Sequence, residues 1–188
     1  PMKRFSILFM IAFLLIPVTM VNAQEALEVG TVLTGDITNA EFEVEYTFTG
    51  TAGNVVIINM PTKDEDGYSN DLSGQIILLD SSNAVIADTA NDYNFDVALV
   101  TQLPADDDYI VIITREDGRS GDTEGNYAVE LIVPDVIGMA DSATGAVSSE
   151  GNAAYYVINS EEDFVLLYGK SAGDFDPEIS ISTLNENN

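Results

Sequence analysis

Apolar and polar residues alternate along much of this chain with a period of two, which is the pattern of a half-buried β-strand. The clearest run covers residues 41–48, in which Glu and Thr alternate with Phe, Val and Tyr. Residues 55–58 are β-branched without interruption, which predicts a strand covered on both faces. Further strands are predicted at 75–80, 84–88, 96–103, 109–115 and 127–133.

Turn-forming clusters separate these strands and indicate the fold class. Asp, Ser, Asn, Gly and Pro gather at 49–53, 80–83, 104–107 and 117–121, and no stretch after residue 23 keeps a helical period. Short strands with frequent turns predict an all-β fold, namely an antiparallel β-sandwich of jelly-roll type. The side chains expected in its core are Phe42, Val44, Tyr46, Phe48, Val56, Ile58, Ile77, Leu79, Leu99, Val111 and Val129.

The first 23 residues have the layout of a secretory signal peptide. A basic start at residues 2–4 precedes an apolar run over 5–20, and small residues lead to Ala23 as they do at a cleavage site. We expect cleavage after Ala23, and therefore a secreted, periplasmic or cell-surface protein. The alternative is a membrane anchor, but the run is short for a span of roughly 20 residues and has Pro17 near its end.

The apolar pattern repeats when the sequence is shifted by 110 residues. Tyr46 then meets Tyr156, and the strand at 55–58 meets the apolar run at 165–168. A repeat predicts a signal peptide at 1–23, a β-sandwich at 24–133, a linker at 134–143 and the start of a second β-sandwich at 144–188. Chance similarity between two all-β segments is the alternative. Because half a sandwich would expose its core face, we expect the protein to continue beyond Asn188.

The charge balance is strongly acidic. The chain has 32 acidic and 6 basic residues, which gives a formal net charge of −26 at pH 7. Such a surface repels phosphate backbones and anionic membrane surfaces, so we expect no nucleic-acid partner. After the first 23 residues there is no second apolar run of spanning length, so we expect no membrane span in the mature chain. It favours solubility, cations and basic partners. Solubility or a saline habitat alone would also account for this charge.

The residue types that most catalytic sites require are missing. The chain has no His, no Cys and no Trp. This composition excludes Ser-His-Asp and Cys-His catalysis, His-ligated zinc and disulfide bonds. A pair of carboxylates of the glycosidase kind does not stand out among so many acids. The sequence therefore predicts a protein that is not an enzyme, with no catalytic residues.

One acidic loop has the residue types of a calcium site. Asp64 and Asp66 are followed by Gly67 and then by Asp71, so carboxylates surround a glycine bend. Calcium takes six to eight oxygen ligands from such flexible loops. Asp64, Asp66 and Asp71 are thus the candidate metal ligands, and calcium is the one cofactor that the sequence suggests. The alternative is a solvated loop, as expected for many acidic loops in so acidic a chain.

A series of short motifs over residues 27–133 resembles the bacterial pre-peptidase C-terminal domain. In order they are Gly35-Asp36-Ile37, Tyr46-Thr47-Phe48, Thr51-Ala52-Gly53-Asn54, Asp71-Leu72, Leu103-Pro104-Ala105-Asp106 with Tyr109, and Gly125-Asn126-Tyr127. Each motif is weak alone, but their order and spacing are those of that family. Asp108 departs from the family pattern, which usually has Gly before this tyrosine. Residues 144–188 resemble a second, truncated copy more loosely.

The resemblance implies a β-sandwich that accompanies secreted proteases or other exported proteins. Such domains are accessory modules, and some are similar to collagen-binding or polysaccharide-binding modules or bind calcium. The expected function is therefore a non-catalytic accessory or binding module of a secreted or cell-surface bacterial protein. Its expected partners are an extracellular polymer, either protein or polysaccharide, or other domains of a parent hydrolase. The alternative function is a structural repeat of an adhesin-like surface protein.

Overall fold

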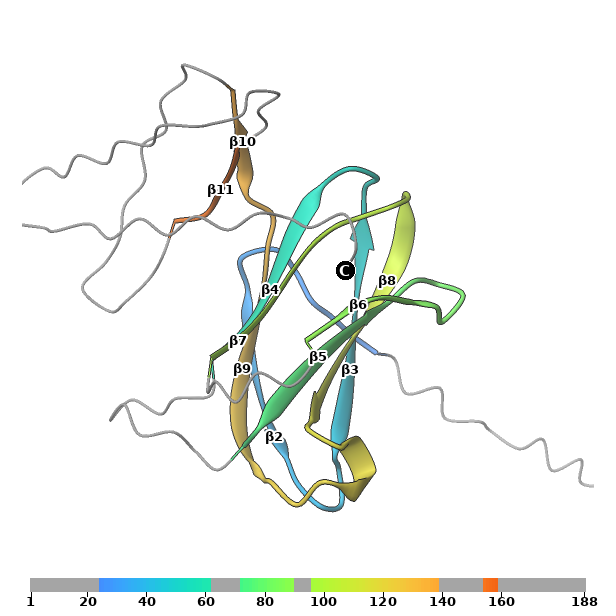
Figure 1. The fold of residues 1–188 in the computed structure, drawn as a ribbon, viewed down its shortest axis with the longest axis vertical. Helices are drawn as coiled ribbons and strands as arrows, with labels where there is room; N and C mark the ends of the chain where they lie inside the picture. The colour runs from blue at the N-terminus through green and yellow to red at the C-terminus, as the bar shows by residue number, and fades with distance from the viewer. Residues whose placement is uncertain (1–23, 62–71, 90–95, 139–153, 159–188) are drawn as a thin grey trace, which may run out of the picture.

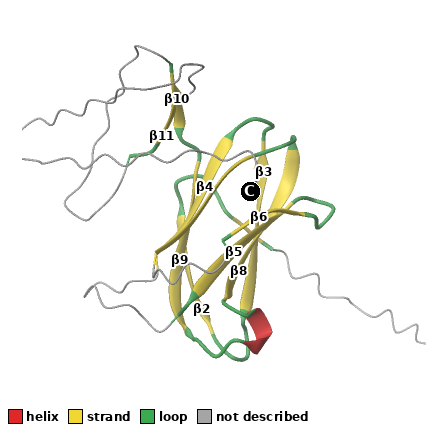
Figure 2. Cartoon of the chain, in the orientation of Figure 1, coloured by secondary structure: helices red, strands yellow, loops and turns green. Residues whose placement is uncertain are grey.

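A computed structural model of the chain describes residues 24–61, 72–89, 96–138 and 154–158. The described residues are mostly β-strand, and the short 3₁₀ helix η1 (Gly118–Ser120) is their only helical element (Figure 2). The strands are β1 (Glu25–Ala26), β2 (Val32–Ile37), β3 (Glu43–Gly50), β4 (Val55–Pro61), β5 (Gly74–Leu79), β6 (Val85–Asp88), β7 (Asp96–Gln102), β8 (Asp107–Arg115), β9 (Gly125–Ile132), β10 (Asp135–Ile137) and β11 (Tyr156–Ile158).

Two sheets face each other and form a β-sandwich (Figure 1). The first sheet has the order β1-β3-β8-β5-β6, and the second has the order β2-β9-β4-β7. Apart from β1, all their strand pairs are antiparallel. Successive strands from β2 to β9 change sheet at every step except the β5–β6 hairpin, which is the jelly-roll arrangement. The predicted fold class is therefore confirmed.

An N-terminal segment, residues 25–31, crosses from one sheet to the other, and we call it the strap. Its first part, β1, runs parallel to β3, and the amide of Leu27 donates to the carbonyl of Thr47 at 2.8 Å. Its second part reaches β9, where the amide of Gly30 donates to the carbonyl of Leu131 at 2.8 Å. The strap thus closes one open side of the sandwich, and Leu27 is buried between the sheets.

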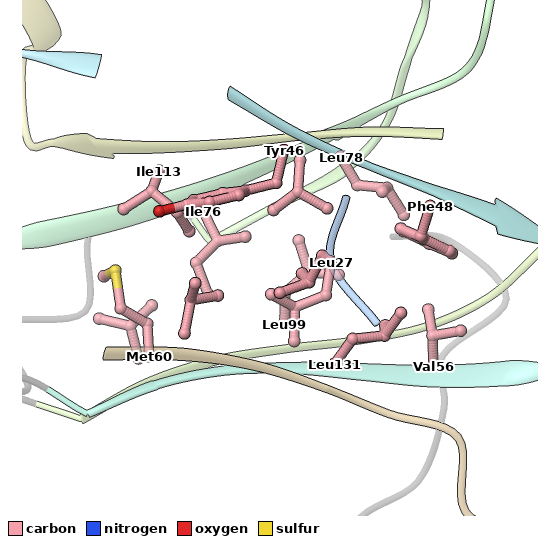
Figure 3. Packing of buried hydrophobic residues seen from close by; sticks show 14 of the residues in the cluster. Leu27, Tyr46, Phe48, Val56, Met60, Ile76, Leu78, Leu99, Ile113 and Leu131 are labelled. Atoms are coloured by element: carbon pink, nitrogen blue, oxygen red, sulfur yellow. The ribbon is translucent and has the colours of Figure 1, made fainter. Parts of the chain in front are cut away.

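The core consists of the inward-facing residues of both sheets (Figure 3). Tyr46, Leu78 and Ile113 come from the first sheet, and they pack against Met60 and Leu131 of the second. Burial of one such aliphatic side chain stabilises the fold by about 1.5–3 kcal/mol. The residues of the sequence-predicted core that are buried are Tyr46, Phe48, Val56, Ile58, Leu99, Val111 and Val129.

The prediction of which β5 side chains face the core was wrong. Ile76 and Leu78 are fully buried, whereas the predicted core residues Ile77 and Leu79 lie on the outer face and are half-buried. The run Ile-Ile-Leu-Leu contains no polar residue that could mark the solvent side, and a one-residue shift moves every side chain to the other face. The expectation for Phe42 and Val44 also needs correction, because both are only half-buried near the start of β3.

Two tyrosine hydroxyls meet inside the sandwich. The hydroxyl oxygens of Tyr46 on β3 and Tyr127 on β9 lie 2.8 Å apart and form a buried hydrogen bond between the sheets. Burial raises the pKa of Tyr127 far above its usual range, and the bond to Tyr46 adds to this rise. Burial also raises the pKa of Tyr46. Both phenols therefore stay protonated in the folded protein at any physiological pH.

Beyond the sandwich, β10 and β11 pair in parallel and form a separate two-stranded sheet. The strand β10 falls in the range expected to be a linker, and β11 falls in the expected second copy. Most of residues 144–188, together with the expected signal peptide, lies outside the described residues. The division of the chain into a complete and a truncated copy therefore stays a prediction.

Candidate functional site

The three carboxylates predicted to bind calcium, Asp64, Asp66 and Asp71, lie outside the described residues. Leu72, which follows directly, is buried in the core and anchors the downstream end of that loop. Among the described parts of the chain, no group of three His, Cys, Asp or Glu side chains is placed to hold a metal ion. The calcium site at 64–71 stays a prediction.

The acidic run at the start of β8 has a structural role. A carboxylate oxygen of Asp106 accepts a hydrogen bond from the amide of Ala52 at 2.8 Å, in the turn between β3 and β4. Asp107 accepts bonds from the amide and the hydroxyl of Ser81, in the turn between β5 and β6. Asp108 accepts a bond from the hydroxyl of Thr49 at 2.7 Å. Three successive carboxylates thus hold neighbouring segments at one end of the sandwich.

Asp80 stabilises the β5–β6 turn in the same way. One of its oxygens accepts bonds from the Ser82 hydroxyl, the Ser82 amide and the Ala84 amide, all within 2.9 Å. These donors favour the charged carboxylate, and the Ser82 hydroxyl lowers the pKa of Asp80 the most. The Ser81 hydroxyl likewise lowers the pKa of Asp107. The carboxylates of this turn are therefore ionised anchors, unlike a catalytic acid, whose pKa must be raised toward neutrality.

A groove of about 700 Å³ lies at this same end, beside the edge of β3. The strap, the last residues of β3, the turn after it and the end of β9 surround the groove. Its apolar lining consists of Ala26, Leu27, Val29, Phe48, Val56, Leu103, Leu131 and Val133. Val29 and Val133 are exposed at its rim, whereas Leu27, Leu103 and Leu131 are buried beneath it. A hollow with an apolar base suits the side chains of a bound partner.

The polar lining of the groove offers hydrogen-bonding side chains. It consists of Thr47, Thr49, Thr51 and Asn54, together with the two carboxylates of Glu28 and Asp108. Neither Glu28 nor Asp108 is buried. The threonine hydroxyls face no imidazole or thiol, because the chain contains neither. The Thr49 hydroxyl donates to the Asp108 carboxylate, and the groove thus surrounds its apolar base with hydrogen-bonding side chains.

A buried arginine organises the opposite end of the sandwich. Arg115, the last residue of β8, is 1% exposed. Its guanidinium donates to the carbonyl of Gly118 at 2.8 Å, the side-chain oxygen of Asn39 at 2.9 Å and the carbonyl of Thr123 at 3.0 Å. It therefore ties the β2–β3 turn to the β8–β9 loop. This role of Arg115 was not predicted, and the one signal for it in the sequence is an arginine at the end of an apolar strand.

In the described residues, no helix is long and apolar enough to cross a membrane. No family model matches the sequence, and no curated protein matches it. The chain is similar in structure to the pre-peptidase C-terminal domain of collagenase from Bacillus anthracis, at 14% identity and a TM-score of 0.41, over 57% of this chain and 92% of that chain.

Two further solved structures are similar to this chain. PliG of Aeromonas hydrophila, a periplasmic inhibitor of g-type lysozyme, matches at 19% identity and a TM-score of 0.36, over 58% of this chain and 99% of that chain. The Yersinia pseudotuberculosis-derived mitogen matches at 18% identity and a TM-score of 0.34, over 62% of this chain and 95% of that chain.

Proposed function

We propose that this protein is a non-catalytic binding module of an exported bacterial protein. The sequence supports export through its N-terminal leader pattern, and the ordered motifs of residues 27–133 resemble an accessory domain of secreted hydrolases. The module would hold its parent protein against an extracellular protein or polysaccharide, or against the parent's other domains.

The observation that carries this proposal is that the carboxylates beside the groove accept hydrogen bonds which hold the turns of the sandwich. Asp106, Asp107 and Asp108 accept hydrogen bonds from three different segments, so their carboxylates are engaged in holding turns. The groove next to them combines an apolar base with hydroxyl and amide groups at its sides. This combination favours recognition of a partner rather than a chemical reaction.

A second candidate function is a structural repeat of an adhesin-like surface protein. The alignment of Tyr46 with Tyr156, and of the run 55–58 with 165–168, favours this candidate because a repeat implies a chain of similar units. The two functions differ in what the single module does. A single binding module is enough to retain its parent protein on a surface. A structural repeat mainly adds to the length of a surface protein.

Retention on insoluble polymers tests the proposal. The full chain is fused to a soluble reporter enzyme, and the exported fusion is mixed with collagen fibres, peptidoglycan and chitin. We expect retention on at least one polymer, several-fold above that of the free reporter, with the kcat of the reporter unchanged. No retention on any of them, together with a complete reading frame made of many such repeats, would favour the structural candidate instead.

A further inference from the structure

We propose that the groove binds an extended, positively charged peptide segment, which adds to the edge of β3 as a new strand. This inference rests on the proposed binding function and specifies its partner. The occupant is a stretch of another protein in which apolar residues alternate with Lys or Arg. Three features of the described structure support it, namely a free strand edge, an apolar base beside that edge, and acidic groups around both.

The free edge begins where the strap leaves β3. The strap pairs with Tyr46 and Thr47, and its last bond to β3 runs from the amide of Leu27 to the carbonyl of Thr47. The backbone groups of alternate residues in a strand face the same side, so the N–H and C=O of Thr49 also face this edge. Within the described chain, no strand pairs with Thr49 on that side. A peptide strand would continue the pairing that β1 begins.

The apolar base lies directly beside this edge. Side chains of an added strand alternate between its two faces, so every second residue would point into the groove. There it would meet Leu27, Phe48 and Leu103, which are buried below, and Val29 and Val133, which are exposed at the rim. The outward N–H and C=O of Thr49 would supply main-chain bonds, and the groove would select apolar side chains at alternate positions.

The acidic residues around the groove favour a partner with positive charge. Glu28 and Asp108 are the charged residues that line it, and Asp80, Asp106 and Asp107 belong to the same end of the sandwich. The described basic residues, Arg115 and Arg119, lie at the other end of β8 or beyond it. Seven residue steps of about 3.3 Å separate Arg115 from the groove residue Asp108, which is roughly 23 Å along β8. The potential at the groove is thus negative, with no described cation nearby to neutralise it.

The negative charge around the groove also disfavours other occupants. A second copy of this chain would bring another net charge of −26 to the groove, and like charges at an interface oppose association. Acidic peptides and polyanionic polysaccharides face the same repulsion. Basic segments of exported proteins are attracted, and their association is faster at low ionic strength.

The test uses a synthetic ten-residue peptide of alternating Val and Lys, titrated into the full exported chain. Binding is followed by calorimetry and by backbone amide shifts in NMR spectra. We expect saturable binding with the largest shifts at Thr49, Thr51 and Glu28. A peptide with Glu in place of Lys, and a peptide with alternate backbone amides methylated, should not bind, because they lose the charge match and the main-chain bonds respectively.

Three variants of the protein complete the test. Glu28→Gln with Asp108→Asn should weaken binding about three- to tenfold, since each exposed charge pair contributes little. Asp117→Asn with Asp122→Asn removes the same charge at the far end and should leave the affinity unchanged. Thr49→Pro removes the outward N–H, which an edge strand tolerates, and should abolish binding while the Tm shows that the protein still folds.

The outcomes separate this inference from the proposed function. Retention of the module on a polymer without saturable binding of the Val–Lys peptide overturns the peptide site alone. Binding of the Val–Glu peptide or the methylated peptide with the same affinity as the Val–Lys peptide also overturns it. So does an equal loss of Val–Lys affinity in the two double variants. If Thr49→Pro fails to fold, the peptide comparisons and the two double variants still decide the question.

Discussion

The hydroxyl groups of Tyr46 and Tyr127 lie 2.8 Å apart between the two sheets, and each is a buried partner of the other. The bond joins β3 to β9, which are 81 residues apart at this point of the sequence. Removal of one hydroxyl leaves the other buried without that partner, which costs more than the bond itself contributes.

A double-mutant cycle measures this bond. Tyr46→Phe and Tyr127→Phe should each lower the free energy of unfolding by about 1–3 kcal/mol, because each leaves a buried hydroxyl unsatisfied. The double variant should lose less than the sum of the two, since no orphan hydroxyl remains. Urea unfolding of the four proteins gives the coupling energy. Additive losses would mean that the two hydroxyls do not depend on each other.

Stability should fall in alkaline solution because of the same pair. The pKa of Tyr127 is raised by burial, whereas an exposed tyrosine in the unfolded chain ionises near pH 10. Above that pH the unfolded state releases a proton that the folded state keeps, so the free energy of unfolding decreases as the pH rises. Urea midpoints between pH 8 and pH 11.5 test this, and Tyr127→Phe should show a shallower decrease. An equal decrease in both proteins would assign the effect to other groups.

Gly35 makes room for the Tyr127 ring, which lies over it on the neighbouring strand. A Cβ atom at position 35 would lie 2.6 Å from the hydroxyl oxygen and 2.7 Å from Cζ of Tyr127. Gly35→Ala should therefore destabilise the protein by about 1–3 kcal/mol, the usual cost of overpacking. Thr34→Ala, at an exposed position of the same strand, is the matched control.

The loss of stability caused by Gly35→Ala should depend on the ring of Tyr127. In a Tyr127→Leu background the ring is absent, so Gly35→Ala should cost much less than in the parent protein. Thermal melts of the four proteins provide this comparison. A loss of the same size in both backgrounds would point to backbone conformation at position 35 rather than to the ring.

Arg115 should be intolerant of replacement by lysine. A single ammonium group cannot reach Gly118, Asn39 and Thr123 together, so Arg115→Lys breaks some of these bonds and leaves a buried charge with fewer partners. We expect a loss of about 2–4 kcal/mol in the free energy of unfolding. Arg119→Lys, at an exposed residue four positions later, should change it by less than about 0.5 kcal/mol. Similar effects of the two changes would contradict the role assigned to Arg115.

Calcium binding at Asp64, Asp66 and Asp71 is tested by calorimetry with a melting series. A site in this loop should saturate between about 10⁻⁴ and 10⁻³ M calcium and should prefer calcium to magnesium. Asp66→Asn with Asp71→Asn should abolish the uptake. Screening of the net charge would also raise the Tm, but it would follow ionic strength and ignore those two changes. Absence of saturable uptake at millimolar calcium would make the loop a solvated surface.

The strands with regular alternation were the ones that sequence reasoning located well. β3 has Glu and Thr on its outer face, so the inward positions of Tyr46 and Phe48 could be read directly. β5 has no polar residue in its apolar run, and its phase depends on packing between β6 and β8, which a linear pattern does not contain. The local sequence pattern therefore located β5 but could not show which of its faces points to the core.

Other features depend on contacts that are distant in the sequence. β2 was not among the predicted strands, because Thr34, Gly35 and Asp36 interrupt its apolar pattern, yet it pairs with β9 along its whole length. The groove joins the strap to the ends of β3 and β9, so no single stretch of sequence marks it. The structural role of Asp106 also depends on a turn 54 residues away. Burial and pairing, rather than residue type, define each of these features.

The pairing of β2 with β9 has a consequence for how the protein reaches its folded state. Val32 at the start of β2 faces Glu130 near the end of β9, so the first strand of the second sheet pairs with the last one in the chain. During synthesis, β2 and β4 have no β9 between them until that strand emerges. Such long-range closure slows folding and leaves strand edges exposed in the meantime. The second sheet can therefore close only after Ile132, the last residue of β9, has left the ribosome.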